Sequence, residues 1–351
     1  MEVQNAFRGC LIGGGLGDAL GYPVEFLSLS EIKRKYGEAG LRELASDDVG
    51  GKALISDDTQ MSLFTASGLL LAKHRMESRE FGSWIESGIY PSYKRWVCVQ
   101  SGFEVVDALA ALPYESDGTL PNILAVRELY ASREPGRACF HTLYRGECGT
   151  IDKPINDSKG CGGVMRVAPI GLFFHRDPMR AATVAADAAA VTHGHPSGFI
   201  SAALFAFVIA CLINGADLLD ALYDGLDYIR RWNGFEETAA AARLAIEYFD
   251  TELPTDAAIS KIGEGWVGEE ALAIALYCAL KEPEPVKALR LSVNHDGDSD
   301  STGAICGNLL GAMYGMSTFP RDWVAKLEIA TFIAEMADAL YKAVSGTEAN
   351  L

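Results

Sequence analysis

The sequence is poor in positive charge and lacks an apolar segment long enough for a bilayer. Its 351 residues include 30 Lys and Arg against 47 Asp and Glu, a formal net charge of −17. Such a surface repels nucleic acid and anionic membranes, so we expect neither as a partner. The longest apolar stretch, residues 199–213, falls short of the ~20 residues that span a bilayer and predicts a buried core helix.

Paired cysteines and a secretory leader are also missing. Eight cysteines are scattered along the chain without a CxxC pair, which argues against a zinc ribbon or a dithiol redox site. The N-terminal segment MEVQNAFRG has no basic region followed by an apolar core, so it does not have the pattern of a signal peptide. These features predict a protein of the reducing cytoplasm.

Patterns typical of β-strands are scarce, with residues 54–58 and 289–293 as the two short candidates. Apolar residues recur instead at helical spacing. The segments with this spacing are 57–76, 121–131, 163–174, 179–191, 197–213, 217–230, 236–248, 269–280 and 321–345. The glycine- and proline-rich region 133–163 is expected to be a long functional loop, because no linker or repeat divides the chain there. The fold is therefore predicted to be all-α, with a single domain over residues 1–351.

Two segments carry glycine at every fourth position. These glycines are Gly9, Gly13, Gly17 and Gly21 near the start, and Gly303, Gly307, Gly311 and Gly315 near the end. Each glycine inside a helix costs up to ~1 kcal/mol relative to alanine, so a row of four requires compensation. Residues four apart share one helix face, and a face of glycines lets another backbone come close. We expect two central, tightly packed helices.

One acidic segment, VNHDGDSDSTG at residues 293–303, precedes thirteen uncharged residues. It places Asp296, Asp298 and Asp300 at alternate positions, where they repel one another by roughly 1 kcal/mol per pair in water. Solvent, a basic side chain or a cation must offset this repulsion. A calcium-binding EF-hand loop is excluded, because it needs glycine at the sixth position and glutamate at the twelfth, where this chain has Ser301 and Gly307.

A second acidic segment, SDDT at residues 56–59, opens another apolar helix. Either segment alone is explained as a helix N-cap, because Ser and Asp are favoured there. Two such segments, with five close carboxylates and two hydroxyls, fit the binding of hard cations better. Oxygen ligands select Mg²⁺, Mn²⁺ or Ca²⁺ over zinc, and two ions that share carboxylates are a recurring catalytic arrangement.

Two further motifs concern anions and histidines. In SKGCGGVMR, residues 158–166, three glycines precede an apolar helix, so backbone N–H groups are available to an anion such as a diphosphate. This segment is neither a P-loop nor a dinucleotide fingerprint. In THGHP, residues 192–196, His193 and His195 lie between two helices. Ordinary hydrogen bonds at helix ends explain them, and no partners for zinc binding are identifiable.

Together these motifs resemble the ADP-ribosylglycohydrolase family. The matching segments are GCLIGGGLGDALGYPVEF (9–26), SDDTQMSL (56–63), INDSKGCGGVMRVAPIGLFF (155–174), VTHGHPSGFISAAL (191–204), GEGWVGEEALAIALYC (263–278) and HDGDSDSTGAICGNLLGAMYG (295–315). The resemblance implies a compact all-α domain with a binuclear metal cleft that holds two Mg²⁺ or Mn²⁺ ions. It also implies a monomer that hydrolyses the bond between ADP-ribose and an acceptor, either a protein side chain such as arginine or a small compound.

The resemblance also assigns roles to residues. The metal ligands would be Ser56, Asp57 and Asp58 on one side and Asp298, Asp300 and Ser301 on the other. Asp296 falls outside this pattern and is expected to be supporting or solvent-facing. The catalytic candidates are Asp57, Asp58, Glu25 and Asp300, and Glu25 also matches a glutamate that gates substrate entry. The residues that match the diphosphate- and ribose-binding region are Ser158, Gly160, Cys161, Gly162, Gly163 and His193.

Cys161 is a departure, because many members of the family have asparagine at this position. A thiol is a poorer hydrogen-bonding group than an amide, which affects the expected contacts to substrate. Covalent catalysis by Cys161 is not expected, since no base is identifiable near it. Two alternatives to the ADP-ribosyl hydrolase remain at this stage. One is an idle, crystallin-like binding protein, and the other is a metal-dependent hydrolase of another nucleoside or of a phosphoester.

Overall fold

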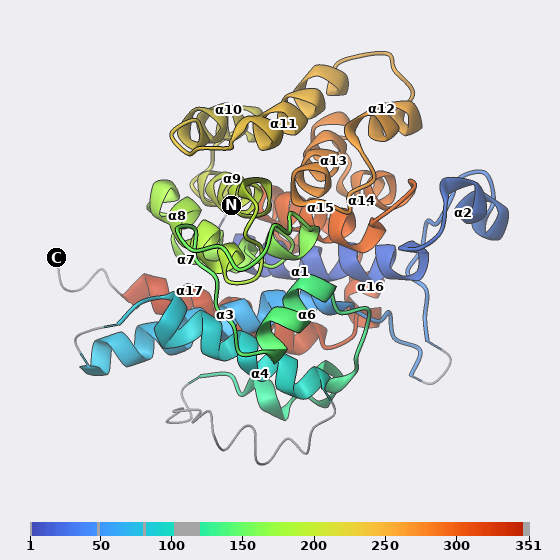
Figure 1. Cartoon of the computed structure of the whole chain (residues 1–351). Coiled ribbons are helices and arrows are strands. Elements are labelled where there is room, and N and C mark those ends of the chain that lie inside the picture. The colour runs from blue at the N-terminus through green and yellow to red at the C-terminus, as the bar shows by residue number, and fades with distance from the viewer. Residues whose placement is uncertain (1, 48–49, 80–81, 102–119, 347–351) are drawn as a thin grey trace.

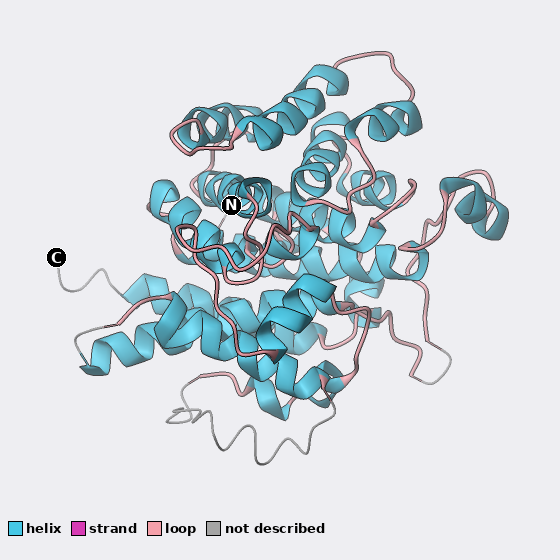
Figure 2. Cartoon of the chain, in the orientation of Figure 1, coloured by secondary structure: helices cyan, strands magenta, loops and turns pink. Residues whose placement is uncertain are grey.

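The computed structural model describes residues 2–47, 50–79, 82–101 and 120–346 (Figure 1). Every regular element in these ranges is helical, which confirms the predicted all-α class (Figure 2). The helices are α1 (Val3–Gly21), η1 (Tyr22–Val24), α2 (Leu29–Tyr36), α3 (Asp57–Arg79), η2 (Ile85–Ile89), α4 (Tyr90–Gln100), η3 (Ile123–Ala125), η4 (Arg127–Tyr130), α6 (Arg137–Tyr144), η5 (Cys161–Gly163), α7 (Ala168–Phe173), α8 (Pro178–Ala190), α9 (Pro196–Ile213), α10 (Leu218–Ile229), α11 (Glu236–Phe249), α12 (Thr255–Ile262), α13 (Gly268–Lys281), α14 (Pro285–Val293), α15 (Ser299–Tyr314), η6 (Met316–Thr318), α16 (Arg321–Lys326) and α17 (Ala330–Ser345).

The two glycine rows lie face to face in the antiparallel pair α1 and α15, which occupies the middle of the molecule (Figure 1). A Cβ atom added to Gly17 would lie 1.9 Å from the carbonyl oxygen of Gly303, and one on Gly307 would lie 1.9 Å from that of Gly13. No other residue type fits at this separation, which confirms the predicted close packing. The pairing brings the C-terminal end of α1 beside the acidic N-terminal end of α15.

The predicted core helix is α9, Pro196–Ile213, which packs against α7, α8, α10 and α13. It is long and apolar enough to cross a bilayer by length and composition, but 89% of its residues are buried within the protein. Burial on all sides explains why this helix is hydrophobic around its whole circumference.

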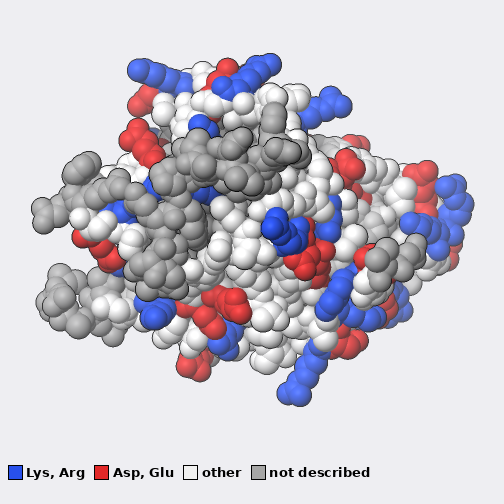
Figure 3. Space-filling view, turned by 90° about the horizontal axis from the view of Figure 1, so that it is seen from below, with Lys and Arg blue, Asp and Glu red and all other residues white. Residues whose placement is uncertain are grey.

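The face in Figure 3 is mixed in charge, with Lys and Arg side chains interspersed among Asp and Glu in its described parts.

Several predicted elements are corrected. Residues 321–345 form two helices, α16 and α17, because the chain leaves the helix to pair with Ala53, whose N–H donates to Lys326 O at 2.9 Å. Residues 121–131 form two short 3₁₀ turns, and side chains of Gln60 and Gln100 bind the carbonyls of this segment.

The remaining corrections concern a helix, the expected loop and the proposed strands. Residues 163–174 give only a short helix, α7, after the 3₁₀ turn η5. The expected loop 133–163 contains a helix of its own, α6. Of the two strand candidates, residues 289–293 lie in α14, and residues 54–58 lead into α3.

Candidate active site

The acidic N-terminus of α3 is held by a carboxylate from α1. Asp18 is completely buried, and its Oδ1 accepts a hydrogen bond from the N–H of Ser56 at 2.9 Å. Its Oδ2 accepts from the N–H of Thr59 at 3.1 Å and also from the Thr59 hydroxyl. A carboxylate that binds the first free N–H groups of a helix stabilises that end of the helix. Asp18 therefore fixes the direction in which the SDDT segment leaves the core.

A buried ion pair holds the residue just before this segment. Arg133 donates to Glu328 through both terminal nitrogens, and its Nη1 also donates to the carbonyl of Ile55 at 2.8 Å. The two side chains are 12% and 9% exposed, so water screens their attraction little. Arg133 thus restrains the backbone at Ile55, and Asp18 restrains it at the next residue, Ser56.

Asp57 and Asp58 themselves are buried at the start of α3. Asp57 Oδ2 accepts a hydrogen bond from the N–H of Gly136 at 3.1 Å. Asp58 Oδ2 lies 3.4 Å from the Ser56 hydroxyl, whereas Asp58 Oδ1 is buried and has no hydrogen-bond partner among the described residues. Burial raises the pKa of both carboxyls well above the ordinary range, and Asp300 and the other nearby carboxylates raise it further.

The acidic entrance to α15 supplies the opposite side. Asp298 caps the helix, with its Oδ1 accepting from the N–H of Ser301 at 3.2 Å. Asp300 accepts from the same N–H at 2.9 Å, and the Cys161 thiol donates to Asp298 Oδ2 at 2.8 Å. Burial raises the pKa of both aspartates. Asp298 and Asp300 both raise the pKa of Asp58, so the two acidic segments lie close enough to interact electrostatically.

Glu25 joins this group from the segment after α1. Its side chain is 8% exposed, and Oε2 has no partner among the described residues. Burial, followed by repulsion from Asp300, Asp298 and Asp57, raises the pKa of Glu25 to about 10. Glu25 therefore carries a proton at neutral pH in this state of the protein.

The glycine-rich loop lies against His193. A Cβ atom on Gly162 would be 3.2 Å from the imidazole Cε1, and one on Gly160 would be 3.5 Å from Nε2. His193 is 1% exposed, and burial together with nearby Arg166 lowers its pKa to about 3, so the imidazole is neutral. Its Nδ1 is 2.8 Å from Thr192 Oγ1. The structure therefore places His193 beneath the loop as a packing partner.

Two of the loop N–H groups are already bonded within the protein. Gly160 N–H donates to Ser158 Oγ at 3.4 Å, and Cys161 N–H donates to the carbonyl of Trp266 at 3.2 Å. An anion at this loop would therefore have to compete for these two N–H groups. Ser158 is half-buried, and its own N–H donates to Asn156 Oδ1 at 3.0 Å.

Comparison with known proteins decides the family. The family model described as ADP-ribosylglycohydrolase matches residues 1–350. The chain belongs to this family. It is 24% identical over 354 residues to the ADP-ribosyl-(dinitrogen reductase) glycohydrolase of Rhodospirillum rubrum, covering 97% of this chain and 96% of that protein. It is also 24% identical over 369 residues to the ADP-ribosylhydrolase ARH3 of Danio rerio, covering 97% and 90%.

A solved structure agrees with this assignment. A chain of an ADP-ribosylglycohydrolase-related protein complex matches with a TM-score of 0.65 and 25% identity, over 98% of this chain and 99% of that one. The family that the sequence motifs resembled is thus confirmed, together with its fold.

The aspartate carboxylates at the starts of α3 and α15 are of the ligand type that binds divalent cations. In this structure, some of their oxygens accept hydrogen bonds from protein groups instead. Within the described residues, no group of three or more His, Cys, Asp or Glu side chains is arranged to hold a metal ion. The oxygens of Asp57 and Asp298 are bonded to Gly136 and Cys161. Buried carboxylates that raise one another's pKa, with Asp58 Oδ1 unpartnered, are nevertheless the environment that a hard divalent cation relieves.

Asp18, Arg133 and Glu328 are site residues that sequence reasoning missed. Asp18 had a signal, because it is the one charged residue between Gly9 and Gly21 in a helix expected to be buried. Arg133 and Glu328 had no such signal in the sequence, since they are 195 positions apart. Asp296 is exposed and accepts a hydrogen bond from the N–H of Leu29 at 2.8 Å, which agrees with the expected solvent-facing position.

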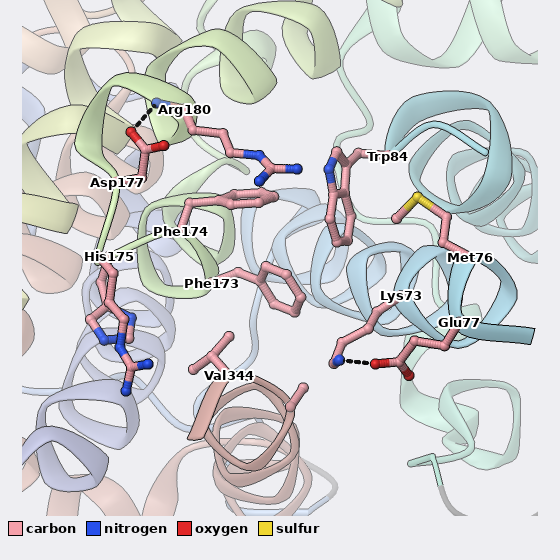
Figure 4. A pocket seen from close by; sticks show the side chains of 12 residues that line it. Lys73, Met76, Glu77, Trp84, Phe173, Phe174, His175, Asp177, Arg180 and Val344 are labelled. Atoms are coloured by element: carbon pink, nitrogen blue, oxygen red, sulfur yellow. Dashed lines mark hydrogen bonds and ion pairs between the residues drawn. The ribbon is translucent and has the colours of Figure 1, made fainter. Parts of the chain in front are cut away.

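The protein also has an aromatic cavity of about 520 Å³, which is lined by residues outside the carboxylate cluster (Figure 4). Its wall includes Trp84, Phe173 and Phe174, and Arg180 stacks over the rings of Trp84 and Phe174. Lys73 in the same wall is paired with Glu77. None of the predicted site residues lines this cavity. It therefore does not belong to the carboxylate centre.

Proposed function

We propose that this protein hydrolyses the glycosidic bond between C1″ of ADP-ribose and an acceptor, either a protein side chain such as arginine or a small ADP-ribosylated compound. The observation that carries the proposal is the convergence of buried carboxylates from three chain segments in a member of this family. These are Asp18, Glu25, Asp57, Asp58, Asp298 and Asp300. Their mutual repulsion is a cost that an unliganded structural protein would have no reason to retain.

Two Mg²⁺ or Mn²⁺ ions would complete this centre. The residues that would hold them are Ser56, Asp57 and Asp58 from the start of α3, and Asp298, Asp300 and Ser301 from the start of α15. Bound ions of this kind supply positive charge for orienting ribose hydroxyls and for acidifying water. The carboxylate and hydroxyl oxygens suit hard cations in type, and the ion pair Arg133–Glu328 keeps the α3 segment in place for them.

The remaining residues would handle protons and position the substrate. Cleavage at C1″ passes through an oxocarbenium-like state, so the departing acceptor needs a proton and the attacking water must lose one. Glu25 is the candidate for the acid, because burial raises the pKa of its carboxyl. Asp57, Asp58 and Asp300 are the candidates for the base. Gly162 and Gly163 would present their N–H groups to the diphosphate.

The test is release of ADP-ribose from two substrates, an ADP-ribosyl-arginine peptide and an ADP-ribosyl-serine peptide, with Mg²⁺, with Mn²⁺ or with EDTA. We expect metal-dependent release from at least one of them, and the comparison of the two peptides identifies the acceptor. Asp298→Asn should abolish release. Asp296→Asn is the matched control, because Asp296 lies on the same loop but is exposed, and it should leave the rate unchanged. Full activity in EDTA would overturn the metal-dependent mechanism.

The identity of the product separates this function from the alternatives. Release of AMP or ADP without ADP-ribose would indicate hydrolysis at the phosphates and not at C1″. Binding of ADP-ribose without turnover of either peptide would indicate an idle binding protein. Mass spectrometry identifies the small-molecule products, and calorimetry with ADP-ribose detects binding without turnover.

A further inference from the structure

The side chain of Lys159, on the glycine-rich loop, points to two carboxylates on neighbouring helices. Its Nζ donates to Glu237 Oε2 on α11 at 2.9 Å and to Glu269 Oε1 on α13 at 2.5 Å. The Ser197 hydroxyl on α9 donates to the same Glu237 oxygen at 2.7 Å. The ammonium thus connects the loop to α11 and α13, and Ser197 joins α9 to the same Glu237 carboxylate.

The backbone on both sides of Lys159 is held in the same place. Gly268 N–H donates to the Lys159 carbonyl at 2.8 Å, and His195 N–H donates to the Ser158 carbonyl at 3.2 Å. Cys161 N–H donates to the Trp266 carbonyl, as described above. The loop is therefore attached at the start of α13 by its main chain and by one side chain.

The charge of Lys159 is neutralised by the two glutamates that it contacts. Two carboxylates face one ammonium, so no positive charge remains for an anionic substrate. Glu269 is 6% exposed, and its Oε2 is buried without a partner among the described residues. Loss of the lysine would leave a buried, unpaired carboxylate, which is strongly destabilising locally. Glu237 is half-exposed and contributes less.

We propose that Lys159 is a positioning residue for the diphosphate-binding loop: it ties the loop to Glu237 and Glu269 and does not itself contact the substrate. This inference rests on the proposed function, because it assigns the loop Ser158–Gly163 to ADP-ribose. A lysine beside a glycine-rich loop would ordinarily be taken as a direct phosphate ligand. The two roles make opposite predictions for the carboxylates.

The experiment measures the Kd of ADP-ribose by calorimetry, and KM and kcat on the ADP-ribosylated peptide that is cleaved. Lys159→Met should raise Kd and KM ~10- to 100-fold through displacement of the loop, with a smaller effect on kcat, and Lys159→Arg should restore most of the loss. Glu269→Gln should also raise Kd. If Lys159 bound phosphate directly, Glu269→Gln would free it, and binding would become tighter or stay the same. That result would overturn the proposal.

Two further variants serve as controls for the size of the effect and for overall charge. Glu237→Gln alters the more exposed partner and should raise Kd in the same direction by a smaller factor. Lys153→Met removes an exposed lysine from the same region and should leave Kd unchanged. An equal loss in Lys153→Met would mean that overall charge, not position, controls binding, and would also overturn the proposal.

Hydrogen exchange provides a readout that does not depend on the reaction. Lys159→Met should accelerate amide exchange of residues 160–164 in the substrate-free protein, whereas Lys153→Met should not. If the wild-type protein neither binds ADP-ribose nor releases it, the proposed function fails, and faster exchange would still show that Lys159 holds the loop. Unchanged exchange in Lys159→Met would overturn the positioning role whatever the activity.

Discussion

The Cys161 thiol donates a hydrogen bond to Asp298 Oδ2 at 2.8 Å and so joins the glycine-rich loop directly to the acidic entrance of α15. Burial raises the pKa of this thiol well above its ordinary range, and the nearby carboxylates Asp298 and Asp58 raise it further. The group therefore stays protonated at neutral pH. It acts as a hydrogen-bond donor to a proposed metal ligand and is a poor nucleophile.

Replacement of this cysteine tests that conclusion. A serine hydroxyl donates to a carboxylate as a thiol does, so Cys161→Ser should keep kcat/KM for ADP-ribose release within ~10-fold of the wild type. Steady-state kinetics measure this directly. A loss on the order of 10³-fold or more, the size seen when a nucleophile is removed, would point to covalent catalysis by Cys161.

Removal of one buried charge should stabilise the metal-free protein. Asp58→Asn takes away a carboxylate whose Oδ1 has no partner among the described residues and whose pKa is raised by burial and by neighbouring carboxylates. In EDTA at pH 7 we expect the free energy of unfolding to rise by ~1–3 kcal/mol, since the variant no longer buries an ionisable group whose ionised form is favoured in the unfolded chain.

Metal ions should reverse this order. MgCl₂ should raise the Tm of the wild type and leave that of Asp58→Asn nearly unchanged, because binding to the folded state stabilises it. Asp296→Asn, at an exposed site, should behave like the wild type in both conditions. Calorimetry in EDTA and in MgCl₂ supplies all the values. An equal Tm increase in Asp58→Asn would remove Asp58 from the ligand set.

The glycine pairs of α1 and α15 should tolerate no side chain. A methyl group on Gly17 would lie 1.9 Å from the carbonyl oxygen of Gly303, so Gly17→Ala must separate the two helices. We expect a loss of ~3 kcal/mol or more in urea unfolding, at the upper end of the cost of overpacking. Gly346→Ala is the control, because a Cβ atom there meets nothing within 4 Å, and its effect should be within ~0.5 kcal/mol.

The buried imidazole of His193 predicts a dependence of stability on pH. Its folded-state pKa of about 3 lies below the ordinary value of 6.5, so the unfolded chain binds the proton more readily. Its contribution is complete above pH ~6.5 and is lost as the pH falls toward 3, by at most ~1.4 kcal/mol per pH unit.

The variant His193→Gln isolates this contribution. Urea unfolding at intervals from pH 8 to pH 4 should show the stability difference between wild type and variant shrinking as the pH falls. A difference that stays constant with pH would mean that His193 titrates normally in the folded protein.

Much of the site was readable in the sequence because its signals are local. The spacing of the glycines gave the two central helices, and the Ser/Asp composition of residues 56–59 and 298–301 marked two buried helix starts. Patterns failed where tertiary contacts overrode them. Residues 321–345 have continuous helical spacing, yet the chain breaks near Ile329, which has a left-handed backbone with φ of 48°. The bond from Ala53 to Lys326, which lies just before this break, has no counterpart in the spacing.

The sequence by itself determined that this protein is helical, that two glycine-faced helices pack at its centre and that acidic segments open two buried helices. The tertiary structure decided which groups meet. Asp298 and Cys161 are 137 positions apart, and Glu269 lies 110 positions from Lys159. Helical periodicity reports which face of one segment is buried, because it repeats within a few residues. Contacts between distant single residues leave no such repeat, so only the packing of the folded chain fixes them.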